Sequence, residues 1–547
     1  MQTRSALHAL ALATTLLFAA CGGNEGSVSV DITQPVPPAT AFTLSLSADK
    51  ALLLQGDSST LTVQLQRQAG FDGAVVVALA NLPAGVTAPP VTIAAGSSSA
   101  TVTLSATAVA PHSLPTDVQV SGTATGQVAS RTLTLTVRGL PGAVDTSFAS
   151  GKIVLPVGPG EDYANAAAVQ ADGKIVVAGS SATTAGTQIS LVRYTRDGVL
   201  DPGFGNAGKV MTLVGSSATG NNDQALAVAV QGDGKVVVAG RSKQAAGDDF
   251  VLVRYNADGS LDAGFGNGGK VLTDFAGGTD VARAILIQAD GKIVVGGDAT
   301  MATSGLDFAL ARYNADGSLD AGFGTGGKVT TALKSGTGTD SVRALAIQPV
   351  QGEARILAVG GEGDFLAARY SASGQLDAGF ATAGKLVGVF GGNIGGAYAV
   401  TVLPDGRAVL AGHDNNDFAL AQLTLAGALD PSFGTGGRVH RAVTTNWDQA
   451  TAVVRQADGK LVVGGWAYSG QGSAGDFVAM RFAADGTPDA GFGQQGLVLT
   501  PMAGGTLGDM AHTLVLQPDE RLPAVRAIQA GEANGANNDY AITRYWL

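Results

Sequence analysis

The sequence predicts an all-β chain with an N-terminal β-sandwich and a C-terminal array of repeated four-stranded units. Three observations support this: short runs in which apolar and polar residues alternate, Asp-Gly dipeptides between such runs, and a segment that recurs every 53–61 residues. Alternation indicates strands that are buried on one face, and Asp-Gly supplies the positive φ angles of tight β-turns. Recurrence at this period indicates one structural unit stacked many times.

Composition limits the class of protein. A chain of 547 residues is too long for one core and predicts at least two domains. Glycine, at 79 residues, has about twice its usual share, without the every-third spacing of collagen. The hydrophobic fraction of 45% excludes a disordered chain, and a single Cys excludes a disulfide scaffold and a cysteine zinc site. The net charge of −11 argues against nucleic-acid binding.

Residues 1–20 are predicted to be a signal peptide. Arg4 is followed by an apolar run that is too short to span a bilayer but typical of a secretory signal. The small residues before Cys21 resemble a bacterial lipobox, which implies that Cys21 is the lipid attachment site. Phe18 stands where Leu is usual, and an ordinary signal peptide with an incidental Cys is the alternative. Residues 21–40, rich in Gly, Ser and Pro, are predicted to be a flexible tether. We therefore expect an exported protein, lipid-anchored to the cell envelope at the outer membrane or cell surface.

Residues 41–139 are predicted to form the sandwich. Runs such as Thr60–Leu65 and Thr132–Val137 alternate strictly, and turn signals such as Asn81–Gly85 fall at roughly 8–12-residue spacing. The stretch Phe71–Leu104 resembles the immunoglobulin-like domains of bacterial surface proteins, which implies a spacer or stalk. We expect no site in this domain.

Residues 140–547 contain seven copies of one unit. The anchor of each copy is Asp-x-x-Phe, at Asp145/Phe148, Asp201/Phe204, Asp262/Phe265, Asp320/Phe323, Asp377/Phe380, Asp430/Phe433 and Asp489/Phe492. Each unit continues with Gly-Lys-Val or a relative, an apolar run, a turn, a second apolar run, and Asp-Phe leading into Arg-Tyr. In the third unit we expect strands at 269–272, 282–288, 292–296 and 307–313. Four short strands per unit predict a seven-bladed β-propeller with four-stranded blades.

The repeated pattern Ala-Asp-Gly-Lys-Ile-Val-Val-Ala-Gly, with Asp-Phe-Ala-x-Ala-Arg-Tyr-Asn-x-Asp-Gly-Ser-Leu-Asp, closely resembles the delta-60 repeat family. The resemblance implies a β-propeller of a kind common in secreted or surface bacterial proteins, with no general enzymatic activity. Three units depart from the pattern: Gly352–Arg355 replaces a turn, Gln422-Leu423 replaces Arg-Tyr, and Asp519-Glu520 replaces Asp-Gly. Because a strand at 151–155 opens the region and another at 540–547 ends it, we expect the two to complete one blade and latch the ring.

Ligand-binding residues are expected on one face of the ring. Since consecutive strands run antiparallel, the Asp-Gly turns and the Asp-x-x-Phe connections emerge on one face, and loops of varied length emerge on the other, as binding loops do. The richest loops, in the fifth and sixth units, supply the candidate ligand-binding residues Trp447, Asp448, Trp466, Tyr468, His413 and Asp414. Such side chains can stack on and hydrogen-bond a sugar or a peptide. The alternative is that both Trp side chains cap the edge of a blade.

The recurrent aspartates are predicted to be structural. Ca²⁺ is compatible with them but needs six or more oxygen ligands, and no Asp-x-Asp-x-Asp cluster supplies several from one loop. Single aspartates in turns usually accept backbone N–H bonds, so we predict neither a metal nor a cofactor. The Arg-Tyr pairs are expected to pack between blades. Since no His-Glu-x-x-His, P-loop or Gly-x-Ser-x-Gly occurs, no catalytic residue is predicted.

These observations predict a monomeric, non-catalytic, lipid-anchored envelope protein whose propeller binds or scaffolds protein or carbohydrate, and not nucleic acid. The alternatives are an extracellular propeller enzyme of the polysaccharide lyase or glycosidase type, and a purely structural surface protein. Clustered carboxylates or histidines in the central channel would favour the enzyme. An open aromatic and polar patch on the face with the varied loops would favour binding.

Overall fold

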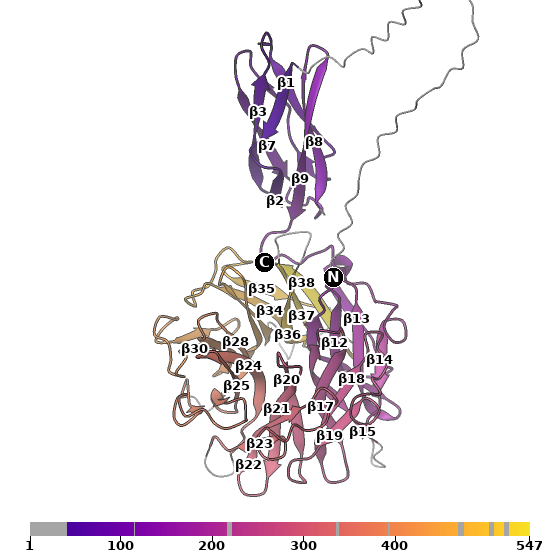
Figure 1. Cartoon of the computed structure of the whole chain (residues 1–547), viewed down its shortest axis with the longest axis vertical. Helices are drawn as coiled ribbons and strands as arrows, with labels where there is room; N and C mark the ends of the chain where they lie inside the picture. The colour runs from indigo at the N-terminus through magenta and orange to yellow at the C-terminus, as the bar shows by residue number, and fades with distance from the viewer. Residues whose placement is uncertain are drawn as a thin grey trace, which may run out of the picture.

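The computed structural model of the chain describes residues 41–113, 115–215, 221–334, 338–391, 394–468, 475–502, 508–518, 525–535 and 537–547 (Figure 1). The predicted signal peptide and tether, with Cys21, lie outside these residues, as does Asp519-Glu520. The described residues form strands and one 3-10 turn, η1 (Ala149–Gly151). Among them, no helix has the length and apolar character needed to cross a membrane.

Two sheets form the first part of the chain. The first sheet consists, in spatial order, of β1 (Phe42–Leu46), β3 (Ser58–Arg67), β7 (Ser99–Ala106) and β5 (Val86–Thr87). The second consists of β2 (Lys50–Leu54), β9 (Gln127–Arg138), β8 (Thr116–Ala124), β4 (Val75–Ala80) and β6 (Val91–Ile93). β2 runs parallel to β9, and all other pairs are antiparallel.

The alternating sequence explains why these two sheets enclose one core. In β3, Leu61 and Val63 are buried while Gln64 is exposed. Side chains from both sheets meet in the same buried cluster, including Val102 of β7 and Val118 of β8. The residues from β1 to β9 therefore form two sheets packed face to face.

Seven sheets follow, each built on four antiparallel strands, and in six of them these strands pair in sequence order. Six of them are β11 (Asp162–Val169), β12 (Ile175–Thr183), β13 (Gly186–Tyr194) and β14 (Lys209–Thr212); β16 (Gln224–Val230), β17 (Val236–Lys243), β18 (Asp248–Tyr255) and β19 (Lys270–Thr273); β20 (Asp280–Ile287), β21 (Ile293–Met301), β22 (Gly305–Tyr313) and β23 (Lys328–Thr331); β24 (Val342–Val350), β25 (Glu353–Gly360), β26 (Leu366–Tyr370) and β27 (Lys385–Val387); β28 (Gly395–Val402), β29 (Ala408–Asp414), β30 (Asp417–Leu423) and β31 (Arg438–Arg441); and β32 (Asp448–Arg455), β33 (Leu461–Tyr468), β34 (Gly475–Phe482) and β35 (Leu497–Thr500). A short strand, β15 (Asn221–Asn222), pairs parallel to β13.

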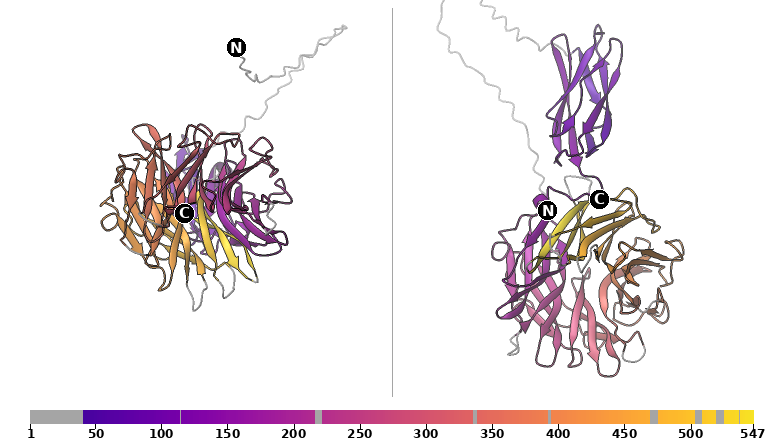
Figure 2. Two further views of the ribbon diagram at one scale, coloured as in Figure 1. Left: turned by 90° about the horizontal axis from the view of Figure 1, so that it is seen from below. Right: turned by 180° about the vertical axis from the view of Figure 1, so that it is seen from behind.

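The seventh sheet joins the two ends of the repeat region. It consists of β36 (Met510–Pro518), β37 (Val525–Asn534), β38 (Asn538–Trp546) and β10 (Lys152–Leu155), with Lys152 opposite Thr543. The first strand of each sheet packs against the first strand of the next, and β36 packs against β11. Figures 1 and 2 show the sheets around a common axis in sequence order. The two ends of the region therefore pair in one sheet and latch the ring.

The two middle strands of each sheet are buried on both faces because the sheets stack on one another. In β17, Val236, Val237, Val238 and Ala239 are all fully buried. Such strands appear in the sequence as continuous apolar runs instead of alternating ones. The Gly-Lys-Val strand of each unit is the outermost strand of a sheet, so each sheet combines strands from two neighbouring units.

A buried ion pair recurs where one sheet meets the next. Arg254 donates from Nε to Asp262 at 2.7 Å and from Nη1 to the carbonyl of Ala315 in the following sheet. The second carboxylate oxygen of Asp262 accepts the N–H of Gly264 at 3.1 Å. Equivalent pairs are Arg193–Asp201, Arg312–Asp320, Arg369–Asp377, Arg481–Asp489 and Arg544–Asp145. These contacts give the aspartates of the Asp-x-x-Phe anchors a structural role.

The phenylalanine of each anchor is part of the core and not of a binding site. All seven rings have 0% exposure: Phe148, Phe204, Phe265, Phe323, Phe380, Phe433 and Phe492. In six units the arginine of the buried ion pair lies over this ring, with its guanidinium carbon 4.4–4.9 Å from the ring centroid: Phe148, Phe204, Phe265, Phe323, Phe380 and Phe492. Because no anchor ring is open to solvent, none can contact a ligand, and the anchors act only as structural residues.

The burial of these rings also explains a glycine of the repeat. A Cβ on Gly317, in an Asp-Gly turn of the following sheet, would lie 2.9 Å from the Phe265 ring, and the φ of Gly317 is +86°. The same approach recurs at Gly427, where a Cβ would lie 2.7 Å from the Phe380 ring. Glycine at this turn therefore serves both the positive φ and the close packing on the anchor ring.

In four of the units the tyrosine of the Arg-Tyr pair bonds to the preceding sheet. Tyr255 donates to the hydroxyl of Thr212 at 2.8 Å, from β18 to β14. The same bond joins Tyr313 to Thr273, Tyr370 to Thr331 and Tyr545 to Thr500. Arg and Tyr of one unit therefore fasten neighbouring sheets on both sides.

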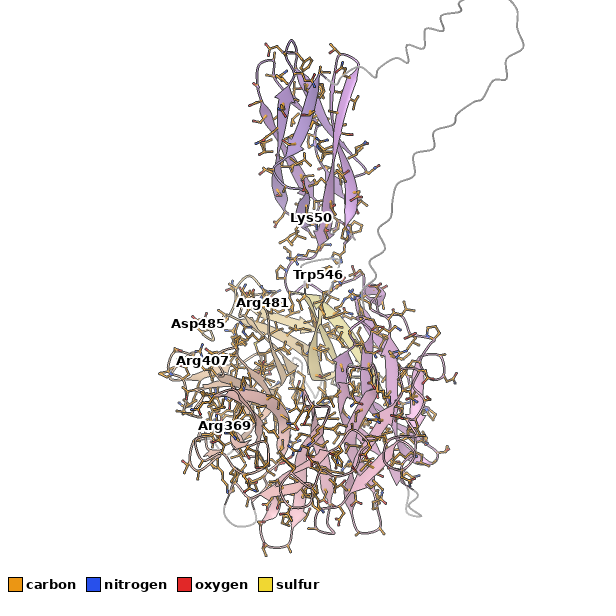
Figure 3. All side chains as sticks on the ribbon, viewed as in Figure 1. Lys50, Arg369, Arg407, Arg481, Asp485 and Trp546 are labelled. Carbon is orange, nitrogen blue, oxygen red and sulfur yellow. The ribbon has the colours of Figure 1, made fainter. Side chains whose placement is uncertain are left out.

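In the unit where Gln422-Leu423 replaces Arg-Tyr, the anchor aspartate Asp430 is still hydrogen-bonded. Gln422 stands where the other units have Arg, and it donates to Asp430 at 2.9 Å. Asp430 keeps its second cation, Arg407, with Nη1 at 2.7 Å from the same carboxylate. The equivalent residue also pairs with the anchor aspartate in other units, as Lys235 does with Asp262. Arg369, Arg407 and Arg481, labelled in Figure 3, belong to three successive sheets.

The sandwich contacts the repeat region at Trp546 (Figure 3). His112 of the sandwich lies edge-on to the Trp546 ring with centroids 4.9 Å apart, and its Nδ1 is 3.4 Å from Asp145. Asp145 is fully buried and also pairs with Arg544, at 2.8 Å. The domain contact and the ring closure therefore share one carboxylate.

We predict that Arg544→Ala destabilises the ring more than any exposed arginine substitution. The guanidinium is fully buried, pairs with Asp145 and donates to Gln517 at 2.8 Å. Removing one member of a buried ion pair costs about 3 kcal/mol or more. Urea unfolding monitored by tryptophan fluorescence measures the loss, since all 3 Trp residues lie in the repeat region. Arg131→Ala, at an exposed side chain, is the control, and equal effects of the two substitutions would contradict the prediction.

Candidate binding cavity on the axis of the ring

An aspartate at the start of the innermost strand holds the loop that precedes it. Asp448 is fully buried, and its carboxylate accepts the N–H groups of Val443 and Thr444, both at 2.7 Å. The equivalents are Asp162, Asp223, Asp280, Asp340 and Asp509. Gly395 occupies this position in the fifth unit, where Asp364 accepts the backbone bonds instead. Asp448, one of the predicted ligand-binding residues, therefore uses its carboxylate inside its own loop.

Three residues after this position, every innermost strand contains a β-bulge. The pairing with the second strand skips one residue in each of the seven sheets. The skipped residues are Asn165, Leu226, Arg283, Arg343, Tyr398, Thr451 and His512. A bulge leaves one residue unpaired and redirects its side chain.

The seven bulge residues line one cavity. Together with Gln449 they enclose about 300 Å³ on the axis of the ring, at the lower end of the range for ligand pockets. All seven side chains are half-buried. The repeat therefore presents a different side chain to the same space from each sheet.

Two arginines line the cavity, and each lies beside a carboxylate. Arg283 donates from Nε to Asp298 at 2.6 Å, and the hydroxyl of Ser341 donates to the same carboxylate oxygen at 2.6 Å. Arg343 lies with its guanidinium carbon 5.3 Å from the centroid of the Tyr398 ring. Burial and the neighbouring Arg283 lower the pKa of Arg343, although an arginine stays protonated in proteins.

A histidine in the lining is paired with a carboxylate. His512 lies 2.6 Å from Glu532 of β37 through its Nε2 atom. Burial lowers the pKa of His512, but the Glu532 carboxylate outweighs burial, so that the pKa is raised overall. Asn165 and Thr451 are tied to the neighbouring innermost strands, through the carbonyls of Ala225 and Ala511, both at 2.8 Å.

Part of the predicted site lies next to this cavity. The His413 ring is 5.6 Å from the Tyr398 ring and 5.3 Å from the Trp447 ring. Burial lowers the pKa of His413 to about 4, so the ring is neutral at pH 7. Trp447 is 39% exposed and is the outermost of the three rings. These contacts link the cavity to the face that carries the varied loops.

The other predicted residues are less accessible. Trp466 is only 7% exposed and packs against Tyr468, with ring centroids 5.1 Å apart. This arrangement fits the alternative in which Trp466 caps a blade edge. Asp414 is buried and lies 3.0 Å from Nε2 of His440.

The bulge residues were missed in the sequence, although they carry a signal. Each is the fourth residue of the pattern Asp-x-Ala-x, as in Asp280–Arg283 and Asp509–His512. Two units differ from the pattern: Val replaces Ala before Arg343, and Gly395 replaces the Asp before Tyr398. An alignment of the units shows that the fourth place varies while its neighbours repeat.

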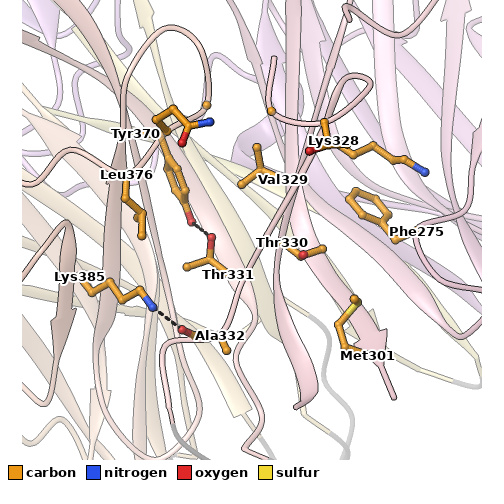
Figure 4. Close-up of a pocket in the computed structure, with 14 residues that line it drawn as sticks. Phe275, Met301, Lys328, Val329, Thr330, Thr331, Ala332, Tyr370, Leu376 and Lys385 are labelled. Atoms are coloured by element: carbon orange, nitrogen blue, oxygen red, sulfur yellow. Dashed lines mark hydrogen bonds between the residues drawn. The ribbon is translucent and has the colours of Figure 1, made fainter. Parts of the chain in front are cut away.

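A larger groove lies elsewhere, between the third and fourth of the sheets counted from β11 (Figure 4). It has a volume of about 690 Å³. Its polar groups already join the two sheets, since Tyr370 bonds to Thr331 at 2.9 Å and Lys385 to the carbonyl of Ala332 at 2.7 Å. The groove is a feature of the repeat, because the corresponding lysines also bond to backbone carbonyls of the preceding sheet or loop: Lys209, Lys270 and Lys328.

Three carboxylates meet on the face with the varied loops. One oxygen of each of Asp249, Asp274 and Asp280 lies within 4.8 Å of the others. Burial and the charges of Asp274 and Asp280 raise the pKa of Asp249 to about 6.

We predict that Asp249→Asn stabilises the fold at pH 7. Because the pKa of Asp249 is raised to about 6, the folded state binds more protons than the unfolded state between about pH 4 and 6, and stability falls as the pH rises through this window. The substitution removes this loss and should raise the free energy of unfolding at pH 7 by about 1 kcal/mol after solvent screening. Urea unfolding in EDTA at pH 4 and pH 7 measures the free energy of unfolding. Asp233→Asn, at an exposed turn, is the control, and a destabilised Asp249→Asn variant at pH 7 would contradict the prediction.

Three solved structures show only a weak likeness to this chain. A DUF4784 family protein from Bacteroides caccae is 10% identical with a TM-score of 0.24, and the match covers 84% of this chain and 99% of that one. Domains 4–9 of the surface layer protein SbsC are 11% identical with a TM-score of 0.14, covering 85% and 83%. The ICAM-5 D1–D4 ectodomain fragment is 11% identical with a TM-score of 0.15, covering 92% and 98%. Likeness at these scores carries no argument about the fold or function, and no curated protein matches the chain.

Five stretches match a family model described as a domain of unknown function (DUF5122) beta-propeller. They are residues 170–204, 231–265, 288–323, 403–433 and 456–492. Each stretch ends on the Phe of an Asp-x-x-Phe anchor: Phe204, Phe265, Phe323, Phe433 and Phe492. These matches support membership of the chain in a β-propeller repeat family.

Proposed function

We propose that this chain is a non-catalytic binding protein of the cell envelope, whose propeller takes carbohydrate or protein into the cavity on its axis. One observation carries the proposal. Seven β-bulges at equivalent positions direct seven side chains into one space, while the surrounding repeat is nearly uniform. Variation in the lining of a cavity on a rigid frame is typical of a recognition site.

The finer architecture belongs to the same proposal. We regard the seven sheets as blades of one closed seven-bladed propeller with delta-60-type repeats. The sandwich is an immunoglobulin-like spacer, and the lipid on Cys21 holds the protein, as a monomer, to the membrane. The spacer would carry the propeller away from the membrane surface.

An enzyme is the second candidate, and one observation favours it. His512 and Glu532 form a close pair, at 2.6 Å, beside the arginines of the cavity. A histidine oriented by a carboxylate is a common general base. A polysaccharide lyase or glycosidase would use such a group on a bound saccharide.

We predict that glycan and protein arrays probed with the purified full chain detect ligands through the cavity. Tyr398→Ala should lower the affinity at least tenfold, because the Tyr398 ring lies both in the cavity and against His413. Trp447→Ala should lower it less. Met211→Ala, at a side chain 38% exposed outside the cavity, is the control. Binding indifferent to Tyr398→Ala, or no binding, contradicts the proposal, and depolymerised glycan that disappears with His512→Ala would establish the enzyme instead.

The membrane anchor has its own test. We predict that Cys21→Ser moves the protein from the membrane fraction to the soluble exported fraction and abolishes incorporation of radiolabelled palmitate. A variant that stays membrane-bound would rule out lipid attachment at this residue.

A further inference from the structure

We propose that the ligand of the cavity is an acidic saccharide, whose carboxylate or sulfate is held by Arg283 and Arg343. The inference rests on the proposed binding function and adds the chemical class of the ligand. It begins from the basic side chains of the cavity. Two arginines and a histidine line it, and each has a carboxylate neighbour: Asp298 at Arg283, Glu362 at Arg343 and Glu532 at His512.

The arginines have donors without acceptors. Within the described residues, the Nη atoms of Arg283 have no hydrogen-bond acceptor, since its Nε alone bonds to Asp298. Nε of Arg343 is buried and unpaired, and its Nη2 reaches only Glu362, at 3.5 Å. The Arg283 side chain is 28% exposed, so its Nη donors are accessible to an anion that enters the cavity. Guanidinium groups match the planar, two-oxygen geometry of a carboxylate.

Both arginines are held in position before a ligand arrives. Asp298 fixes Arg283, and Ser341 fixes Asp298 from the next sheet. Arg343 is limited on one side by the Tyr398 ring. A preorganised pair of cations loses little conformational entropy on binding, which favours affinity.

The remaining groups favour a saccharide over an acidic peptide. Trp447 is 39% exposed and offers a ring face on which a sugar can stack. Tyr398, which Arg343 and His413 contact, offers its hydroxyl to a ligand, and His413 is uncharged at pH 7. The amide of Gln449 and the hydroxyl of Thr451 can bond to sugar hydroxyls. A space of about 300 Å³ admits a short saccharide or the end of a longer chain.

Isothermal titration calorimetry on the full chain tests the inference with matched probes. Trigalacturonate is compared with its fully methyl-esterified form, which has the same sugars without the charge, and with glucose 6-sulfate. We expect trigalacturonate or glucose 6-sulfate to bind at least tenfold more tightly than the ester, with an affinity that falls as salt rises. Arg343→Gln should remove this preference while the weak binding of the ester stays within twofold. Arg343→Lys keeps the positive charge but lacks the planar pair of donors of a guanidinium, so it should retain part of the preference for the acidic probe.

Several results would overturn the acidic-saccharide assignment. Equal affinity for trigalacturonate and its ester, an acidic preference that survives Arg343→Gln, or no binding of any acidic probe would each do so. Tighter binding of triglutamate than of trigalacturonate would identify an acidic peptide as the ligand instead. Equal affinity for free sulfate and for glucose 6-sulfate would show that the site binds anions without recognising a sugar. Thermal unfolding of each variant verifies that it is folded. Array ligands that are neutral but lost with Tyr398→Ala would leave the proposed function standing while this inference fails.

Discussion

The rest of the ring depends on the buried arginine–aspartate pair at each junction between sheets. The pair joins three segments at once: the end of the third strand, the Asp-x-x-Phe turn, and a carbonyl of the following sheet. A charge in the interior is stable only when it is paired and hydrogen-bonded. Each junction therefore accepts one geometry. Where Gln422 replaces Arg, the anchor Asp430 is still paired, because Gln422 donates to it and Arg407 remains beside it.

A frame held by identical junctions leaves few positions free to differ. The aspartate at the start of six innermost strands is used by its loop, and the middle strands are packed on both faces. The bulge residue is less constrained, since its pairing with the second strand is already interrupted. Diversity in the axial cavity therefore costs the frame little stability. The same reasoning explains why the larger groove between sheets, with its repeated lysine bonds, is uniform.

The sequence predicted what local chemistry encodes. Asp-Gly turns, Asp-x-x-Phe anchors and apolar runs each act within a few residues, and the strands formed where these signals placed them. The proximity of His413 and Trp447 also followed from antiparallel order alone. The cavity could not be found this way. Arg283 and Arg343 belong to different sheets and look like ordinary strand residues, and only the pairing with a second strand reveals the bulges that turn them to the axis.

The pairing of β10 with β38 has a consequence for the order of folding. Lys152 is among the first residues of the repeat region to leave the ribosome, and its partner Thr543 is among the last. Contacts between such distant positions form slowly, because a long loop must close first. Until then the edges of the incomplete ring are open to pairing with other chains. A nascent or truncated chain is therefore prone to aggregation. Pairing of β38 with β10 covers the open strand edges and ends this risk.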